Sequence, residues 1–304
     1  MNIFQRWILT ACAGFLVAET SVARAWDNDG HEAVTAVALQ YAPTLRPKVA
    51  AVVARLPASK SWKRLEATGL SKHNPYQTQK SDPDGWVKAL PSQVELAATF
   101  PDWARDYKGY VPSRYEKLHF YDLDFASGDD HFIETPNALT VLVPFEKSFR
   151  KSSPGEQAWE LVWIMHIVGD LHQPLHCASR AVPGKGESDH GGNSITYERA
   201  KLHAFWDHLP DRSFGKDPSR YAASLLAGMN SLPSASKRAL MKQAEDLNPN
   251  HWVKEGRELI VKIGYPADGR VPAGEYDADA RQIADRQILL AGLRLSHVLE
   301  QVLR

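Results

Sequence analysis

Two histidine–aspartate pairs are the residues in this sequence best suited to bind a metal ion. His166 and Asp170 lie four residues apart, and His203 and Asp207 repeat that spacing. Residues four apart share one face of an α-helix at about 5–6 Å, so each pair can contact one ion. A single pair is more often a hydrogen bond on a helix surface, but two pairs together with His176 favour metal binding.

The first pair lies in an apolar segment, with Trp159, Val162, Trp163 and Ile167 around it. A helix of this composition is normally buried, and a buried carboxylate such as Asp170 needs a charge partner. A metal ion is a strong partner of this kind. Pro174 should end the helix, which places His176 just beyond its C-terminus.

Further motifs extend this pattern over essentially the whole chain after residue 25. They are Trp26-x4-His31, Pro101-Asp102, Leu118-His-Phe-Tyr-Asp122, His166-x2-Gly-Asp-x-His-Gln-Pro-Leu-His176, Gly191-Gly-Asn193, Leu202-His-x2-Trp-Asp207, Asn250-His-Trp-Val-Lys-Glu255 and Ala291-Gly-Leu-Arg-Leu295. With these motifs the sequence resembles the secreted zinc-dependent single-strand nucleases. That family includes fungal enzymes, mung-bean-type plant bifunctional nucleases and bacterial relatives. The block from His166 to His176 is the most specific part of the resemblance.

The resemblance implies a site for three Zn²⁺ ions. The first would be bound by Asp102, His119, His166 and Asp170, the second by the α-amine and carbonyl of Trp26, by His31 and by a bridging Asp170, and the third by His176, His203 and Asp207. These nitrogen and oxygen donors suit zinc. Two zinc ions about 3.5–4 Å apart can acidify a shared water for in-line attack on phosphorus, and a third can stabilise the leaving oxygen.

The resemblance also implies the remaining catalytic groups and the substrates. Acidic residues that orient or deprotonate the nucleophile are expected at Asp122 and Asp124. We favour Asp124, although either carboxylate could instead hold a ligand histidine in place. The expected substrates are single-stranded DNA and RNA, cleaved to 5′-phosphorylated products, and 3′-nucleotides.

Several positions depart from the family pattern, all on the side of the nucleobase. The loop from Cys177 to His190 is long, the hairpin after it is short, and Lys201 stands where an asparagine is usual. Leu209 stands where fungal relatives place a base-contacting asparagine. Base preference and the balance between DNA, RNA and 3′-nucleotides therefore stay open. Asn193 is expected to be structural, closing the turn beneath the site.

Two other functions compete with the nuclease. A zinc-dependent phospholipase C shares the helical three-zinc scaffold, but its last metal pair ends in glutamate, whereas this chain has Asp207. A non-enzymatic exported zinc-binding protein is the other alternative, and retention of all nine ligand positions argues against it. Fold alone does not decide between these functions.

Helical spacing of apolar residues predicts the elements that must position these groups. It occurs in residues 31–41, 157–171, 219–229, 252–263 and 279–303. The best strand candidate is residues 193–197, which could form a small hairpin with the residues leading to Leu202. We therefore expect an all-α fold with one compact domain over residues 26–304 and a small β-hairpin. The resemblance implies that this fold is of the zinc-dependent phospholipase C and nuclease type.

Residues 1–25 have the features of an export signal. Arg6 is followed by an apolar stretch and by Ala23-Arg24-Ala25, which predicts cleavage between Ala25 and Trp26. A lipoprotein signal ending at Cys12 is the weaker alternative because its apolar core would be short. We expect a secreted or periplasmic protein that does not span a membrane. Cleavage would leave Cys177 as the one cysteine, so no intrachain disulfide could form.

The formal net charge is zero, with 36 basic and 36 acidic residues. A protein of this charge has no general basic field for gripping duplex phosphate, so any affinity for nucleic acid must be local. We expect a monomer without a stable protein partner.

Overall fold

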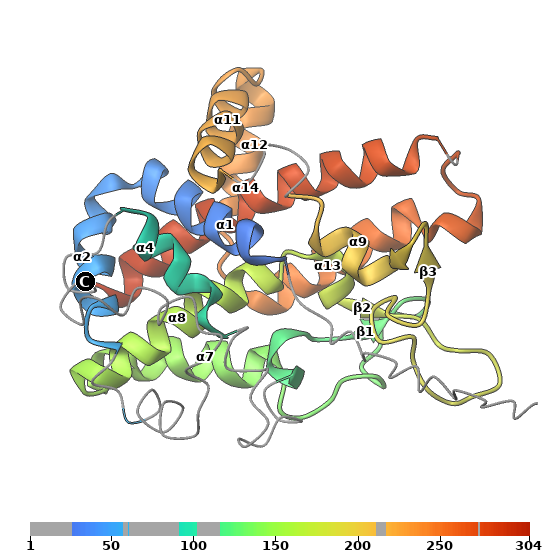
Figure 1. The fold of residues 1–304 in the computed structure, drawn as a ribbon, viewed down its shortest axis with the longest axis horizontal. Coiled ribbons are helices and arrows are strands. Elements are labelled where there is room, and N and C mark those ends of the chain that lie inside the picture. The colour runs from blue at the N-terminus through green and yellow to red at the C-terminus, as the bar shows by residue number, and fades with distance from the viewer. Residues whose placement is uncertain (1–25, 57–59, 61–90, 102–115, 211–216, 273) are drawn as a thin grey trace, which may run out of the picture.

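The computed structural model describes residues 26–56, 60, 91–101, 116–210, 217–272 and 274–304. The predicted export signal and the predicted ligand Asp102 lie outside the described residues. The described part is mainly helical, as the sequence predicts (Figure 1).

The α-helices are α1 (Asn28–Tyr41), α2 (Arg46–Val53), α4 (Pro91–Leu96), α7 (Ala138–Ser148), α8 (Pro154–Asp170), α9 (Leu202–Asp207), α11 (Pro218–Asn230), α12 (Ser234–Ala244), α13 (Pro249–Ile263) and α14 (Tyr276–Val302). Short 3-10 helices connect them: η1 (Pro43–Leu45), η4 (Ala97–Thr99), η5 (Glu116–His119), η6 (Phe149–Lys151), η7 (Pro174–His176) and η8 (Pro266–Asp268). All five helices expected from apolar spacing are present. Four of them begin three residues earlier than the apolar pattern, after N-caps such as Asp27 before α1 and Ser153 before α8, and α11 begins one residue earlier.

Two small sheets of two strands accompany the helices. Strands β3 (Thr196–Tyr197) and β4 (Ala200–Lys201) form the predicted antiparallel hairpin. Strands β1 (Leu123–Asp124) and β2 (Ala178–Ser179) form a parallel pair that the sequence did not predict, with Leu123 opposite Ala178. Strands of two residues are too short to show an alternating pattern.

Helices α1, α8 and α14 supply the centre of the fold. Helix α8 is buried continuously from Ala158 to Asp170, which confirms the expectation of a buried helix. Helix α1 packs against α14 and α11, and α11 and α12 project together from the rest of the molecule (Figure 1). The approach of α1 to α14 requires glycine at position 292, because a Cβ there would lie 2.4 Å from the Cβ of Val37.

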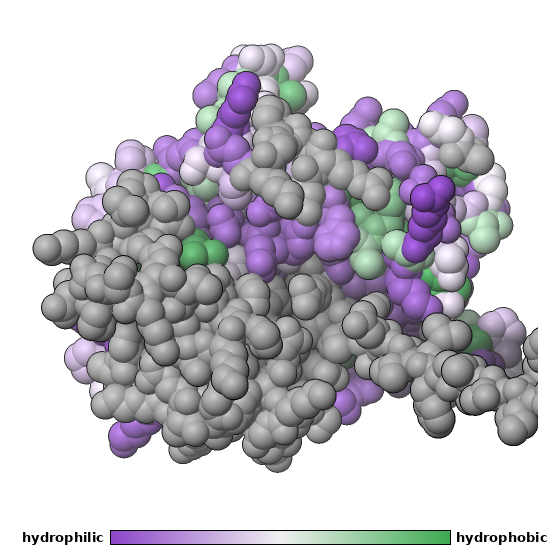
Figure 2. Space-filling model, viewed as in Figure 1, coloured by the Kyte–Doolittle hydropathy of each residue, from purple (hydrophilic) through white to green (hydrophobic). Residues whose placement is uncertain are grey.

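The described part of the face seen in Figure 2 is largely hydrophilic. None of the described helices combines the length and apolar character needed to cross a bilayer, and this includes the 27-residue α14. Cys177 is a free, buried thiol on the segment between η7 and β2.

Candidate metal centre

A first group of possible metal ligands forms where α1 meets the C-terminal end of α8. His31, His166 and Asp170 are all fully buried, and one ligand atom from each lies within 4.8 Å of the others. His31 Nε2 is 3.3 Å from Asp170 Oδ1, and His166 Nε2 is 3.3 Å from Asp170 Oδ2. The two imidazoles stack with their centroids 3.8 Å apart.

Local sequence explains how His31 reaches α8 from 135 residues away. The side chain of Asp27 caps α1 by accepting a hydrogen bond from the backbone of Gly30, so His31 lies in the first turn. Gly169 precedes the ligand Asp170, and a Cβ there would lie 2.7 Å from Nδ1 of His31. A glycine is therefore required for this imidazole to rest against α8.

His119, at the end of η5, joins the first group. Its Nδ1 lies 3.1 Å from Asp170 Oδ2 and 2.8 Å from His166 Nε2. Both oxygens of Asp170 therefore face imidazole nitrogens, which is the arrangement expected for a carboxylate that bridges two ions. Asp102, the remaining predicted ligand of the first ion, lies outside the described residues.

A second group forms between η7 and α9. His176 Nε2 lies 3.0 Å from His203 Nε2, which in turn is 3.7 Å from Asp207 Oδ2. These three residues are buried and could hold one ion. The structure thus brings together the two histidine–aspartate pairs with His31, His119 and His176, as the sequence predicts.

The imidazoles of both groups are oriented by backbone carbonyls. Nδ1 of His166, His176 and His203 lies 2.8, 2.7 and 2.8 Å from the carbonyl oxygens of Ala98, His119 and Gly191. A carbonyl only accepts, so each Nδ1 must carry a proton, and in the neutral ring each Nε2 then presents its lone pair to the group.

This tautomer makes the donor set fit a divalent cation. The Nε2 lone pairs of His176 and His203 face each other at 3.0 Å, an arrangement that is repulsive unless a cation lies between them. Within the part of the chain that the structure describes, His31 forms no hydrogen bond through either ring nitrogen. Burial, and then the nearby His166 and His176, hold the pKa of His31 well below its ordinary value, which leaves a neutral imidazole able to bind a metal.

The two groups are linked by the chain around His119. Its ring belongs to the first group, while its carbonyl oxygen orients His176 of the second. The Tyr121 amide donates to the carbonyl of His176 at 2.9 Å, and β1 and β2 continue this pairing. The parallel strands β1 and β2, which the sequence did not predict, therefore hold the two groups of metal ligands side by side.

Trp26 is fully buried beside the first turn of α1, where a Cβ on Gly30 would lie 2.5 Å from the Cβ of Trp26. The next residue, Asp27, donates its amide to the carbonyl oxygen of Asp207 at 3.1 Å. The chain at Trp26 is therefore attached directly to α9, which carries ligands of the second group. Binding of an ion by the amine of Trp26 stays a prediction.

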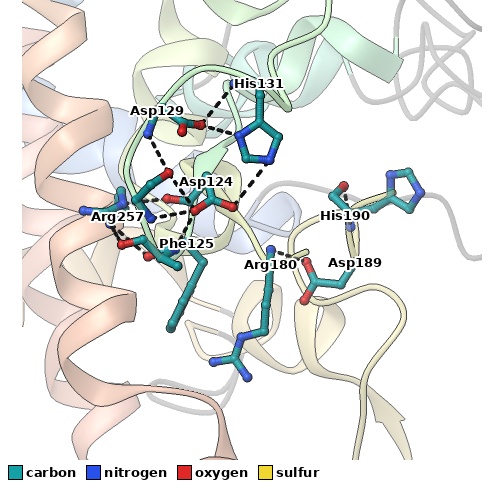
Figure 3. A network of polar contacts seen from close by, with 11 residues as sticks. Asp124, Phe125, Asp129, His131, Arg180, Asp189, His190 and Arg257 are labelled. Atoms are coloured by element: carbon teal, nitrogen blue, oxygen red, sulfur yellow. Dashed lines mark hydrogen bonds and ion pairs between the residues drawn. The ribbon is translucent and has the colours of Figure 1, made fainter. Parts of the chain in front are cut away.

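The two candidate catalytic carboxylates have different surroundings. Asp124 Oδ1 accepts three hydrogen bonds from its own loop, from the amide of Ala126 and from the amide and hydroxyl of Ser127. Its Oδ2 lies 3.7 Å from His131 Nε2, and His131 also pairs with Asp129 (Figure 3). Asp124 therefore organises the loop that follows β1.

Asp122 is buried and keeps one carboxyl oxygen free. Oδ2 accepts from the hydroxyl of Ser179 at 2.7 Å, whereas the buried Oδ1 has no hydrogen-bond partner among the described residues. Burial raises the pKa of Asp122 to about 7, the hydrogen bond from Ser179 opposes this, and Asp189 adds to it. A carboxyl group with a free oxygen and a near-neutral pKa is suited to exchange protons.

Gln173 is a positioning residue that the sequence did not single out, although it lies inside the most specific motif. Its amide nitrogen donates to Asp207 Oδ1 at 2.8 Å, and its Oε1 accepts from the Leu175 amide at 2.5 Å. Gln173 thereby leaves Asp207 Oδ2 to face the second group.

His172 is a second such residue, and it connects the metal ligands to the C-terminal helices. Nδ1 lies 2.7 Å from the carbonyl of Val168, and Nε2 accepts from Arg294 at 2.9 Å. Arg294 is buried on α14 and forms two short contacts, of 2.7 and 2.9 Å, with Glu255 of α13. The motifs containing Glu255 and Arg294 therefore have a shared role in holding the segment between Asp170 and His176.

The structure also describes the positions that the sequence analysis placed in the turn beneath the site and on the side of the nucleobase. The side chain of Asn193 donates to the carbonyl of His190 at 2.8 Å, which confirms its structural role in the turn. Leu209 is fully buried. Lys201 is exposed on β4.

A family model described as S1/P1 Nuclease matches residues 26–304. Endonuclease 4 of Arabidopsis thaliana is 27% identical over 157 residues, which cover 47% of this chain and 50% of that protein. Nuclease S1 of Aspergillus oryzae is 28% identical over 130 residues, or 39% of this chain and 43% of the relative. The matched region spans about half the length of the curated relatives.

Proposed function

We propose that this chain, which belongs to the S1/P1 nuclease family, is an exported zinc-dependent endonuclease for single-stranded DNA and RNA. The products would carry 5′-phosphates, and 3′-nucleotides would be further substrates. The observation that carries the proposal is the pair of Nε2 lone pairs of His176 and His203, which face each other at 3.0 Å. Such an arrangement calls for a bound cation.

The proposed site takes three zinc ions, with the nine ligands that the family pattern assigns: Trp26, His31, Asp102, His119, His166, Asp170, His176, His203 and Asp207. Convergence of His31, His119, His166 and Asp170 supports the first two ions, and the group around His176 supports the third. Bound zinc would supply an acidified water as nucleophile and neutralise charge on the phosphodiester.

The chain's own residues would prepare this site for the reaction. Backbone carbonyls hold the histidine tautomers, and Gln173 directs Asp207 toward its group. We assign the proton-accepting carboxylate to Asp122 rather than Asp124, because Asp122 Oδ1 is free whereas Asp124 Oδ1 is engaged by its own loop. Asp124 would then shape the loop that follows β1.

Selectivity for single strands follows from burial and charge. All the described ligands are buried, so the phosphodiester must bend inward to reach them. A paired base cannot be splayed out onto a side chain, whereas an unpaired one can. With a formal net charge of zero, the protein has little general attraction to offset the cost of opening a duplex.

The test is an activity panel on the purified protein that begins at Trp26. Substrates are single- and double-stranded DNA, RNA and a 3′-nucleotide, each with and without a chelator, and phosphatidylcholine tests the phospholipase alternative. We expect chelator-sensitive cleavage of the single strands and loss of cleavage in His176→Ala. The exposed His251 supplies a matched control, since His251→Asn should stay active. Hydrolysis of phosphatidylcholine without cleavage of nucleic acid would overturn the proposal.

A further inference from the structure

We propose that Arg180 forms a stacking subsite for an unpaired nucleobase, at a cavity beyond the ends of β1 and β2. The inference rests on the proposed function, because it places a second part of the same single strand. The subsite would bind a nucleotide several positions away from the phosphodiester that is cleaved. It would therefore affect long substrates and leave mononucleotides unaffected.

The two parallel strands lead from the metal ligands to this cavity. His119 precedes β1 and His176 precedes β2, while Phe125 and Arg180 directly follow these strands. The Phe125 amide donates to the carbonyl of Ser179 at 2.8 Å, so the residues that follow the two strands stay side by side. Arg180 follows His176 by four residues, which span at most roughly 13 Å, so a strand bound at the metals needs only a few nucleotides to reach Arg180.

Arg180 is fixed before any ligand binds. Its two terminal nitrogens lie 2.8 and 2.6 Å from the two carboxyl oxygens of Asp268. Its Cζ atom is 3.8 Å from the ring centroid of Tyr265 and 4.3 Å from that of Phe125. A guanidinium held in this way loses little conformational freedom when a ligand stacks on it.

Among the described residues, the rings of Phe125 and Tyr265 pack on the guanidinium of Arg180 and occupy one part of its surroundings. Their centroids are 5.3 Å apart, so together with the distances to Cζ they subtend roughly a right angle at Arg180. The side chain is nevertheless 30% exposed. The uncovered side is therefore available as a flat surface, and guanidinium planes are known platforms for unstacked bases.

The cavity beside Arg180 has the size and chemistry for a nucleotide. Its volume is about 500 Å³, and it is lined by Asp124, Phe125, Ala126, Arg180, Ala181, Asp268 and Arg270. In Figure 3 the side chains of Phe125 and Arg180 extend to the same side of the strand ends. Arg257 of α13 holds the wall through the carbonyls of residues 124, 125 and 126, at 2.8 to 2.9 Å.

The charges favour a base at Arg180 and a phosphate beside it. Arg180 is already paired with Asp268, so its free face offers stacking more than unbalanced charge. Arg270 is 46% exposed, and its Nε is 3.9 Å from the same carboxylate. It can reach an adjoining phosphate. Arg180 also belongs to the 177–190 segment, which the sequence comparison with the family pattern leads us to expect to be long.

A length series of single-stranded oligonucleotides tests the proposal. For the unchanged protein, KM should fall stepwise once the strand is long enough to reach Arg180. Arg180→Met and Arg180→Lys should both remove this step, with kcat/KM on long strands about tenfold lower and 3′-nucleotide hydrolysis unchanged. Arg238→Met, at an exposed position on α12, is the matched control.

The outcomes separate this proposal from the proposed function. Hydrolysis of 3′-nucleotides and short strands without any dependence of KM on length would overturn the subsite and leave the nuclease assignment intact. Full activity in Arg180→Lys with loss in Arg180→Met would show charge attraction instead of stacking, and would also overturn it. Asp268→Asn, which frees the guanidinium without removing it, should give an intermediate loss on long strands only.

Discussion

Replacing Arg294 by methionine should destabilise the protein and loosen the metal centre together. Methionine keeps much of the apolar stem of arginine but removes the guanidinium, which is buried and contacts Glu255, His172 and the carbonyl of Gln243. The variant leaves the carboxylate of Glu255 without its cation and Nε2 of His172 without its donor.

The size of the effect follows from these contacts. Removing one partner of a buried ion pair costs about 3–5 kcal/mol, and an unsatisfied buried acceptor costs about 1–3 kcal/mol. The side chain of Glu255 is 25% exposed, so water takes up part of its charge and the lower values apply. We expect Arg294→Met to lower the free energy of unfolding by about 4 kcal/mol.

Urea denaturation measures this loss, and competition with a chelator measures the metal affinity. Because His172 lies between Asp170 and His176, we expect zinc to bind about tenfold more weakly in the variant. Arg238→Met, at an exposed position on α12, should change neither quantity. Adding Glu255→Gln should restore part of the stability, since it removes the uncompensated charge.

A loss of less than about 1 kcal/mol, below the range for breaking a buried pair, would refute this reasoning. So would a strictly additive effect of the Arg294→Met and Glu255→Gln substitutions, because residues in one network should couple. Reduced stability with unchanged zinc affinity would show that the Arg294–Glu255 ion pair stabilises the fold but does not influence the metal ligands.

Three further predictions concern separate parts of the molecule. Asp170→Asn should abolish hydrolysis and lower both zinc content and Tm, because its two oxygens face three imidazoles; lost activity with full zinc content would contradict the bridge. One extra residue before Trp26 should lower zinc content and turnover, since a peptide nitrogen is a poor ligand; equal values would make Trp26 only a hydrophobic anchor. Burial raises the pKa of Glu146 to about 7. The free energy of unfolding is therefore unaffected by Glu146 below the unfolded pKa of the carboxyl, and it falls as pH rises toward 7 because the buried carboxyl must then ionise. Glu146→Gln should have the same free energy of unfolding as the unchanged protein near pH 4, and a value higher by at most about 3 kcal/mol at pH 8. Equal Tm values at pH 8 would contradict this shift.

Sequence spacing predicted the helices and the local part of the site. The pairs His166–Asp170 and His203–Asp207 are short-range features, because one helix turn alone brings their side chains together. The resemblance added His31 and His119, which the fold brings to the first group, while His176, expected just beyond the helix end, joins the second group. Their convergence depends on tertiary packing that no periodicity encodes.

The features that sequence reasoning missed are long-range contacts. Strands β1 and β2 contain two residues each, so their pairing left no pattern to detect. Arg294 and Glu255 were visible as motif residues, but Arg294 contacts His172, 122 residues away, and Glu255, 39 residues away. Asp122 and Asp124 are distinguished only by neighbours in space, since Ser179 lies 57 residues from the carboxylate that it contacts.

Zinc reconstitution of the chelated protein tests the central claim most directly. Circular single-stranded DNA is the substrate, because its linearisation reports endonuclease cleavage alone. The metal centre described above predicts no cleavage after chelation, and recovery that saturates near three zinc equivalents per chain, with none in Asp170→Asn. Cleavage that persists without metal, or that is complete after a single equivalent, would contradict the assignment of these histidines and aspartates as a three-zinc catalytic centre.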